Sequence, residues 1–399
     1  MNELIHRIND KVEDLFSQAV CDRRYLHQHP ELSFHEFETC AYIRARLDEL
    51  RIPSHIVANT GIVAILEGEI PGNDDILVLR ADIDALPIEE MNDVDFRSVH
   101  KGVMHACGHD FHIANLLAVA TVLHDLKDTY SGRILLLFQP AEEKIPGGAV
   151  EILKSGILES FGGNVRAVLG LHVSPRLPLG KLGVRSGRFM ASSDEFYITI
   201  KGRGGHAAEP HLAIDPVMIA VQLLNTLQQI VSRKADPNIP SVLTFGHFEA
   251  KGAANVIPDQ VHMAGTFRTV DEKWRSEALQ QIETIIRTMP LALGASVDLE
   301  IRRGYPTLLN NPQLAEKSKE IWVRLLGEGS VEDIDIWMAA EDFAYYSHVY
   351  PSLFVLLGTD NGSQNTQYGL HNAQFNLAEE AFKTSIPAIS CMAIELLNK

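Results

Sequence analysis

Side chains that bind metal ions are concentrated in one short stretch of the sequence, which holds His105, Cys107, His109 and His112. The stretch precedes residues 113–125, whose apolar spacing predicts an amphipathic helix. A thiolate and an imidazole two residues apart, on a loop that enters a helix, can bind one metal ion together. An isolated Cys-x-His pair is nevertheless more often a buried cysteine beside buried histidines, so the pair alone leaves both interpretations open.

Polar residues that follow three predicted strands strengthen the metal-site interpretation. The strands are short apolar runs at residues 76–80, 133–138 and 165–171. They lead to Asp84, Glu143 and His172, respectively. A single strand that ends in a polar residue is ordinary, but ligands of open α/β sheets bind outside the carboxyl ends of the strands. Three such residues and the Cys107 loop therefore predict one shared site at that edge of a sheet.

The pattern of apolar residues also predicts how the chain is divided. At 399 residues the chain is too long for one ordinary core, so two domains are expected. Between residues 194 and 302 the predicted order is strand, helix, strand, strand, helix, strand, which is a ferredoxin-like α+β order. We therefore expect an α/β domain with a mixed, mostly parallel sheet flanked by helices, interrupted by this small domain. The expected parts are residues 1–185, 186–303 and 304–399.

Two segments resemble caps that open helices in the α/β domain: Ser33 with Glu36, and Asn376 with Glu379. In each, the first side chain can accept from a free backbone N–H at the helix start, and the glutamate three residues later can accept from the backbone N–H of the first residue. The first predicts a helix that reaches about Leu50, and the second predicts the start of the last helix.

Composition excludes several classes of partner. The chain has 35 basic and 52 acidic residues and a net charge of −17, which disfavours binding to nucleic acid or to an anionic membrane surface. No apolar run approaches the roughly 20 residues of a membrane span. The four cysteines have no framework spacing and the sequence opens without a signal-peptide pattern, so we expect a cytoplasmic protein with free or metal-bound thiols.

Eleven segments of the chain match a known family in order, over nearly its whole length. They are residues 80–87, 104–112, 139–143, 170–172, 204–208, 209–211, 215–216, 255–258, 265–268, 340–343 and 370–371. On these segments the chain resembles the di-metal amidohydrolases of the aminoacylase and carboxypeptidase superfamily. It is most similar to the branch of hippurate hydrolases, indole-acetyl-amino-acid hydrolases and N-acetyl-diaminopimelate deacetylases. The resemblance implies a catalytic domain with an inserted lid domain.

The resemblance also implies roles for individual residues of a site with two divalent ions, Zn or Mn, with Co or Ni as alternatives. The implied metal ligands are Cys107, His109, Glu143, His172 and His371, with Cys107 as the bridge. Glu142 is implied as the general base and acid, and Asp84 as a residue that orients a ligand. Asp82 is expected to lie next to the ligands, and His105 and His112 are expected to support them.

The lid is implied to contribute substrate contacts. His206 is expected to hold the substrate or its developing oxyanion, reaching across a homodimer or higher oligomer formed through the lid. Asn255 and Arg268 resemble the pair that receives the substrate's carboxylate. The expected reaction is hydrolysis of the amide of an N-acyl or N-aroyl amino acid, and a carboxypeptidase or dipeptidase activity on short peptides is the alternative. Phe111 is bulkier than the small residue that the family pattern has between Asp110 and His112, and Phe267 replaces the more usual aliphatic residue before Arg268. Either could reshape the pocket.

Overall fold

The structure, a computed structural model, describes residues 2–72, 74–363 and 366–398. It consists of two compact units. The larger contains residues 1–187, 309–335 and 342–399, and the smaller contains residues 188–308 and 336–341. The smaller unit is therefore inserted into the sequence of the larger one. Within the described residues, every helix is too short or too polar to cross a membrane.

The larger unit is built on one eight-stranded sheet with the strand order β1-β2-β4-β3-β5-β16-β6-β15. The strands are β1 (Ser54–Val57), β2 (Gly61–Glu67), β3 (Asp75–Asp82), β4 (Arg133–Gln139), β5 (Asn164–Pro178), β6 (Leu182–Val184), β15 (Val331–Asp333) and β16 (Ser352–Asp360). In the middle of the sheet β4, β3, β5 and β16 run parallel. β2 pairs antiparallel with both of its neighbours, whereas β6 pairs antiparallel with β16 and parallel with β15. The predicted mixed, mostly parallel sheet is confirmed.

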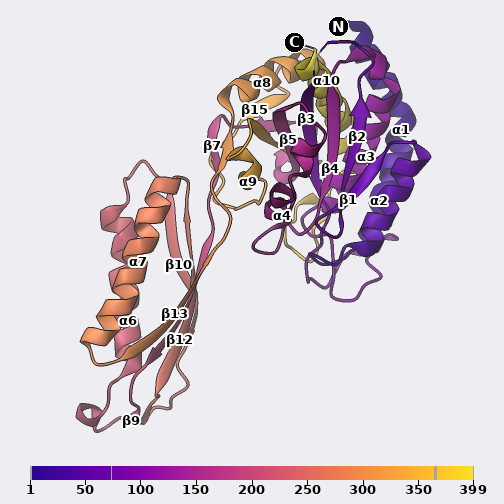
Figure 1. Cartoon of the computed structure of the whole chain (residues 1–399). Coiled ribbons are helices and arrows are strands. Elements are labelled where there is room, and N and C mark those ends of the chain that lie inside the picture. The colour runs from indigo at the N-terminus through magenta and orange to yellow at the C-terminus, as the bar shows by residue number, and fades with distance from the viewer. Residues whose placement is uncertain (1, 73, 364–365, 399) are drawn as a thin grey trace. The chain divides into compact units, whose positions relative to one another are not determined.

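Helices cover both faces of this sheet, as Figure 1 shows. They are α1 (Asn2–Gln28), α2 (Phe37–Glu49), α3 (His109–Asp125), α4 (Gly148–Ser155), α5 (Ile157–Ser160), α8 (Pro312–Leu326), α9 (Ala344–Ser347) and α10 (Phe382–Leu397). α3 and α10 pack on β3, while α4 packs on β4 and α5 packs on β5. Because helices cover both faces of the sheet, β3 and β4 are almost completely buried, and most of their residues are apolar.

Buried charges join α1 to the first turn of α3. Asp110 Oδ2 accepts from Arg23 Nε at 3.0 Å and from His27 Nδ1 at 2.9 Å. The other ring nitrogen of His27 lies 3.1 Å from Glu90 Oε1. Burial disfavours the charged imidazole, but the two carboxylates outweigh burial and raise the pKa of His27. The residue that precedes Asp110 is His109, so this network fixes where α3 begins.

The smaller unit has a four-stranded antiparallel sheet with the order β10-β12-β8-β13 and two long helices. Its main elements are β8 (Asp194–Lys201), α6 (Pro216–Gln229), β10 (Ser241–Glu249), β12 (Gln260–Thr269), α7 (Glu272–Ala292) and β13 (Ser296–Arg303). This is the ferredoxin-like arrangement that the alternating strands predicted. A short pair, β9 (Gly205–His206) and β11 (Val256–Ile257), forms a separate two-stranded sheet. β7 (Gly187–Met190) and β14 (Leu308–Asn310) lie where the chain passes between the units.

Both predicted helix caps in the larger unit are wrong. α2 begins at Phe37 rather than near Ser33, and Ser33 Oγ donates to Asp84 at 2.6 Å. α10 begins at Phe382, and Asn376 Oδ1 instead accepts from Arg23 Nη2 at 3.0 Å. In each case a buried charged group uses the polar side chain that the local pattern assigned to a helix end.

Candidate metal centre

The predicted site lies at the carboxyl ends of the parallel strands of the larger unit. β3 ends at Asp82, which is paired with Gln139 at the end of β4, and His172 lies on the neighbouring strand β5. Helix α3 starts at His109 after Gly108, whose φ of +84° is a backbone conformation that favours glycine. A Cβ at Gly108 would also lie 2.5 Å from a methyl group of Val173, so the loop that carries Cys107 packs directly against β5.

The five side chains predicted as metal ligands lie close together. Cys107 Sγ is 3.4 Å from His172 Nε2, and Glu143 Oε1 is 3.2 Å from His371 Nε2 and 3.9 Å from His109 Nε2. Two groups whose ligand atoms all lie within 4.8 Å contain Cys107, one with His109 and His172 and the other with Glu143 and His371. A third group joins His109 and Glu143 to Glu142. Thiolate, imidazole and carboxylate ligands in overlapping groups suit borderline divalent ions.

The hydrogen bonds of these side chains leave their ligand atoms directed at the cluster. His109 donates from Nδ1 to the carbonyl of Asp84 at 2.8 Å, and His172 donates from Nδ1 to the carbonyl of Val173 at 2.7 Å. Within the described part of the chain, the buried atoms His109 Nε2 and Glu143 Oε1 have no hydrogen-bond partner. Metal-binding histidines are held in this way by their second nitrogen. The residues therefore fit a metal centre.

The electrostatics of the clustered side chains lead to the same conclusion. Burial disfavours a charged ring, but Asp82, Asp84 and Glu143 outweigh burial and raise the pKa of His109 to about 10. Burial, followed by the charges of Glu143 and Glu142, raises the pKa of the Cys107 thiol well above its usual value. An excess of buried negative charge thus attracts protons, and divalent cations would satisfy the same groups.

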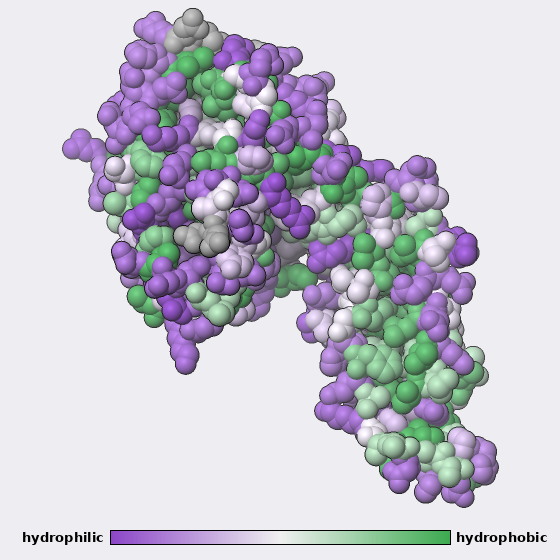
Figure 2. All heavy atoms as spheres, turned by 180° about the vertical axis from the view of Figure 1, so that it is seen from behind, coloured by the Kyte–Doolittle hydropathy of each residue, from purple (hydrophilic) through white to green (hydrophobic). Residues whose placement is uncertain are grey.

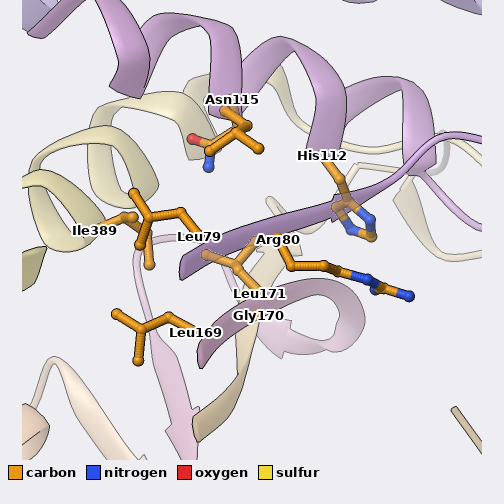
Figure 3. Close-up of a pocket in the computed structure, with 9 residues that line it drawn as sticks. Leu79, Arg80, His112, Asn115, Leu169, Gly170, Leu171 and Ile389 are labelled. Carbon is orange, nitrogen blue, oxygen red and sulfur yellow. The ribbon is translucent and has the colours of Figure 1, made fainter. Parts of the chain in front are cut away.

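A buried network lies behind the ligands and contains Asp82. Arg80 donates to Asp82 at 2.7 Å, to Asp342 at 2.8 Å and to Gln139 at 3.0 Å. Figure 3 shows Arg80 on β3 and His112 on α3 beside a cavity of about 20 Å³. That volume corresponds to about one water molecule, so the cavity is too small to hold a substrate.

His112 and His105 are placed differently from the candidate ligands. His112 donates from Nδ1 to Asp82 at 2.6 Å and accepts at Nε2 from the N–H of Val173 at 3.0 Å. Both of its nitrogens are therefore used, although it lies near His109. His105 is fully buried, and its burial lowers the pKa of the ring to about 4. His112 thus contacts Asp82 and β5 with its two nitrogens, whereas neither ring nitrogen of His105 has a hydrogen-bond partner among the described residues. The supporting roles of both residues stay predictions.

The comparisons with known proteins agree with this geometry. The profile of peptidase family M20/M25/M40 matches residues 78–394. A thermostable carboxypeptidase of Saccharolobus solfataricus is 35% identical over 401 residues, which cover 100% of both chains. An N-acetyl-L-cysteine deacetylase of Bacillus subtilis is 39% identical over 368 residues, covering 92% of this chain and 85% of the relative. The chain belongs to the M20 peptidase family. The predicted family is confirmed.

A solved M20 structure provides the link to metal binding. The chain is similar to a dinuclear metal-binding peptidase of Bacillus subtilis, with a TM-score of 0.81 and 34% identity over 96% of this chain and 99% of the other. The M20 fold and a grouped set of metal-binding side chains are thus both present in this protein.

The two bulky residues that depart from the family pattern lie in hydrophobic cores. Phe111 is buried on α3 and stacks on Phe382 with ring centroids 4.1 Å apart. Phe267 is buried in the core of the smaller unit. The expectation that either residue could reshape the pocket is therefore not supported by their placement.

The predicted substrate residues of the smaller unit are not all brought together. His206 and Asn255 are neighbours, since Asn255 O accepts from the N–H after His206 at 3.0 Å and both side chains are exposed. The segment that carries β9 is tied to the start of β12, because Gly202 N and Gly204 N donate to Asp259, the residue before that strand. Arg268 lies nine residues further along β12, or about 30 Å at the rise of a strand. The predicted pair of Asn255 and Arg268 is therefore separated within one chain.

Two buried carboxylates hold the loop that carries Glu142 and Glu143. Asp84 accepts from the N–H of Glu142 and from the N–H of Glu143, both at 3.0 Å. Glu36 accepts from the N–H of Ala141 at 2.9 Å and from Thr60 Oγ1 at 2.6 Å. The sequence pattern assigned Glu36 to a helix cap and so missed this contact. A glutamate without a cation nearby in the sequence gives no signal for such a role.

The charge of Glu36 predicts a pH dependence of stability in the metal-free protein. Burial raises the pKa of Glu36 and the hydrogen bond from Thr60 lowers it; burial has the larger effect, so the pKa rises from 4.5 to about 7. Between these values the unfolded chain ionises while the folded chain keeps its proton, so stability falls as pH rises, by roughly 3 kcal/mol in total. Glu36→Gln does not titrate at this position. Its melting temperature relative to wild type should therefore rise between about pH 5 and pH 8, and a constant difference would contradict the assignment.

Proposed function

We propose that the protein is a metal-dependent amidohydrolase that releases an amino acid from an N-acyl or N-aroyl amino acid. The observation that carries the proposal is that the two candidate ligand groups around Cys107 are joined, through His109 and Glu143, to a group that contains the buried carboxylate of Glu142. The finer assignments of substrate, metal and residue roles rest on this geometry and on the relatives. The M20 deacetylase that is 39% identical acts, by its name, on an N-acetyl amino acid.

The chemistry assigns separate roles to the residues of the loop. Cys107, His109, Glu143, His172 and His371 would hold two divalent ions, Zn or Mn, or else Co or Ni. When bound, two such ions would supply a water of lowered pKa and a polarised amide carbonyl. Glu142 accepts the proton of the attacking water and passes it to the leaving nitrogen. Asp84 orients His109 through its carbonyl and fixes the backbone of Glu142 through its carboxylate.

The experiment that tests the proposal starts from metal-free protein. Zn, Mn, Co and Ni are restored separately, and each sample is assayed with hippurate, N-acetyl-diaminopimelate, an indole-acetyl amino acid and dipeptides. We expect hydrolysis of at least one N-acyl amino acid, dependent on the added metal. Inactivity with all metals and substrates would overturn the proposal and leave a binding protein of the same fold.

Cleavage of short peptides is the second candidate function. A relative that is 35% identical is named a carboxypeptidase, and an N-acyl amino acid and a peptide present the same scissile amide next to a free carboxylate. The ratio of kcat/KM for an N-acyl amino acid and for the matching dipeptide separates the two functions. A ratio well below one would favour the peptidase.

We also propose that the smaller unit is a lid through which the protein forms a homodimer. β10 is an edge strand, with Val242 and Phe248 exposed, and α6 exposes Met218 and Val221. Figure 2 shows hydrophobic side chains on the visible face of this unit. Exposed apolar residues next to an unpaired strand edge are typical of an interface. A dimer would also allow His206 and Arg268 of different chains to serve one substrate.

A change at the β10 edge should disrupt this dimer. Val242→Lys places a charge at the proposed interface, so the mass in solution, measured by light scattering, should change from dimer to monomer. Val349→Lys, at an exposed position of the larger unit, is the matched control and should remain dimeric. A wild-type monomer would contradict the proposal.

Mixed dimers test whether His206 acts across the interface. If it does, a dimer of one Glu142→Gln chain and one His206→Ala chain contains one site with both native residues. Random mixing of the two weak variants should then restore about a quarter of wild-type activity, since half of the dimers are mixed and each has one complete site. No recovery on mixing would assign His206 to its own chain.

A further inference from the structure

We infer that Glu36 is a positioning residue for the loop that carries Glu142 and Glu143, and that it acts by binding the backbone N–H of Ala141. The inference rests on the proposed function of that loop. It assigns a mechanistic role to the segment between α1 and α2, which supplies no candidate metal ligand. The observations that carry it are the hydrogen bonds of three successive N–H groups, the backbone conformation of Ala141 and the burial of Glu36.

Three successive N–H groups of the loop are bound by carboxylates. Ala141 donates to Glu36 Oε1 at 2.9 Å, and Glu142 and Glu143 donate to the two oxygens of Asp84 at 3.0 Å each. Asp84 alone fixes the peptide groups of the two functional residues. Glu36 adds the preceding one, so the backbone is held from the end of β4 to Glu143.

Ala141 has a conformation that needs such support. Its φ of +54° lies in the left-handed region, which disfavours a residue with a Cβ. Its carbonyl accepts from the N–H of Gly148 at 3.0 Å, and a Cβ at Gly148 would lie only 1.8 Å from the carbonyl oxygen of Pro140. The turn is therefore held on its carbonyl side by a close backbone contact and on its N–H side by Glu36. Since Glu142 follows directly, a change in this turn would move its carboxylate.

Glu36 is itself held rigidly. Its side chain is fully buried, and in addition to Ala141 it binds the N–H of Phe34 at 2.9 Å and the hydroxyl of Thr60 at 2.6 Å. It precedes α2 directly but makes no side-chain hydrogen bond to the N-terminus of that helix. A buried carboxylate that does not cap its own helix is costly unless its acceptor bonds are used. Here they tie the start of α2 and the start of β2 to the loop.

The neighbouring Ser33 makes the same connection to Asp84. Its hydroxyl donates to Asp84 Oδ2 at 2.6 Å, and Ala85 N donates to the carbonyl of Glu31 at 2.8 Å. The segment from Glu31 to Glu36 therefore supplies one of the two carboxylates that hold the loop, Glu36, and contacts the other, Asp84. Glu36 affects Glu142 and Glu143 only through the backbone of the loop, at the N–H of Ala141. It is therefore a positioning residue and not a catalytic one.

The test compares three variants of the metal-loaded protein. Glu36→Ala removes the acceptor and should lower kcat roughly tenfold to a hundredfold, with KM and metal content little changed, because small displacements of a reacting group have such effects. Glu36→Gln keeps an acceptor for Ala141 and can donate to Thr60, so it should remain within about threefold of wild type. Thr60→Val removes a bond to the same carboxylate without touching Ala141, and it should lower the melting temperature but not kcat.

Hydrogen exchange of a peptide spanning residues 138–148 provides a readout that does not depend on activity. Exchange should accelerate in Glu36→Ala and not in Glu36→Gln or Thr60→Val. An inactive wild-type enzyme would defeat the proposed function but leave this measurement intact. If Glu36→Ala does not fold, Glu36→Met replaces it, because methionine fills similar space but lacks the carboxylate oxygen that accepts from Ala141. Equal losses of kcat in the Ala or Met variant and in Thr60→Val, or unchanged exchange in the loop, would overturn the inference.

Discussion

Glu142→Gln is expected to lower kcat by roughly 10²–10⁴, the usual contribution of a general base, while the bound metal remains at the wild-type level. The reason is the placement of Glu142. Its carboxylate lies within 4.8 Å of His109 and Glu143, yet the two groups around Cys107 do not include it. It is also buried, and Asp84 fixes its backbone N–H at 3.0 Å. The amide of glutamine keeps the shape and the hydrogen bonds of the backbone but cannot accept a proton.

Glu143→Gln is the matched control for this prediction. Its N–H is bound by the same Asp84 carboxylate, and neither substitution removes these backbone hydrogen bonds. Only Glu143 belongs to a group with Cys107 and His371, so its substitution should reduce the metal content, measured by elemental analysis after dialysis. If Glu142→Gln lost metal to the same extent, or kept kcat within tenfold of wild type, Glu142 would not be the general base.

The sequence contained most of the site because its residues follow elements with strong patterns. β3, β4 and β5 are apolar runs that become parallel neighbours, and parallel strands place their carboxyl ends together. The strand pattern alone therefore predicts that Asp84, Glu143 and His172 lie at one edge of the sheet, without knowledge of their contacts. His371 had no such signal, because it lies on a loop far along the chain, and only the family resemblance assigned it.

The contacts that the sequence did not reveal involve buried charges from distant segments. Ser33 and Glu36 match a capping box, but the local pattern does not contain Asp84 or Ala141, which take their hydrogen bonds. A cap is worth about 1 kcal/mol, whereas an unpaired buried carboxylate or N–H costs more, so the distant partner prevails. The same competition places Asn376 beside Arg23 rather than at the end of α10.

The separation of Asn255 and Arg268 was, in contrast, readable from the sequence. Asn255 precedes the predicted strand at residue 260 and Arg268 lies near its end, so an extended strand had to place them far apart. Family motifs record which residues are used but not which chain supplies each of them. The separation of the two residues within one chain therefore raises a specific question, namely whether a second chain supplies one of them in the proposed dimer.

Cys107→Ala is expected to have the second large effect, namely loss of bound metal together with activity. Cys107 is the member shared by the group with His109 and His172 and the group with Glu143 and His371. Its sulfur is 3.4 Å from His172 Nε2, and it is buried beside acidic residues. Removing a residue that hydrogen-bonds a ligand commonly lowers metal affinity 10–100-fold, so loss of a shared ligand should exceed about 10². Competition with a chelator measures this change directly.

Two further variants distinguish a bridging ligand from a buried thiol that only packs. Cys107→Asp restores an anionic ligand of harder character, so it should retain more metal than Cys107→Ala and should favour Mn over Zn relative to wild type. Cys40→Ala removes another buried cysteine, on α2, and should leave metal content unchanged. If Cys107→Ala kept two ions per chain at wild-type affinity, the two groups around Cys107 would not form a single centre. Because the shared position joins them, loss of this one side chain should release both ions rather than one.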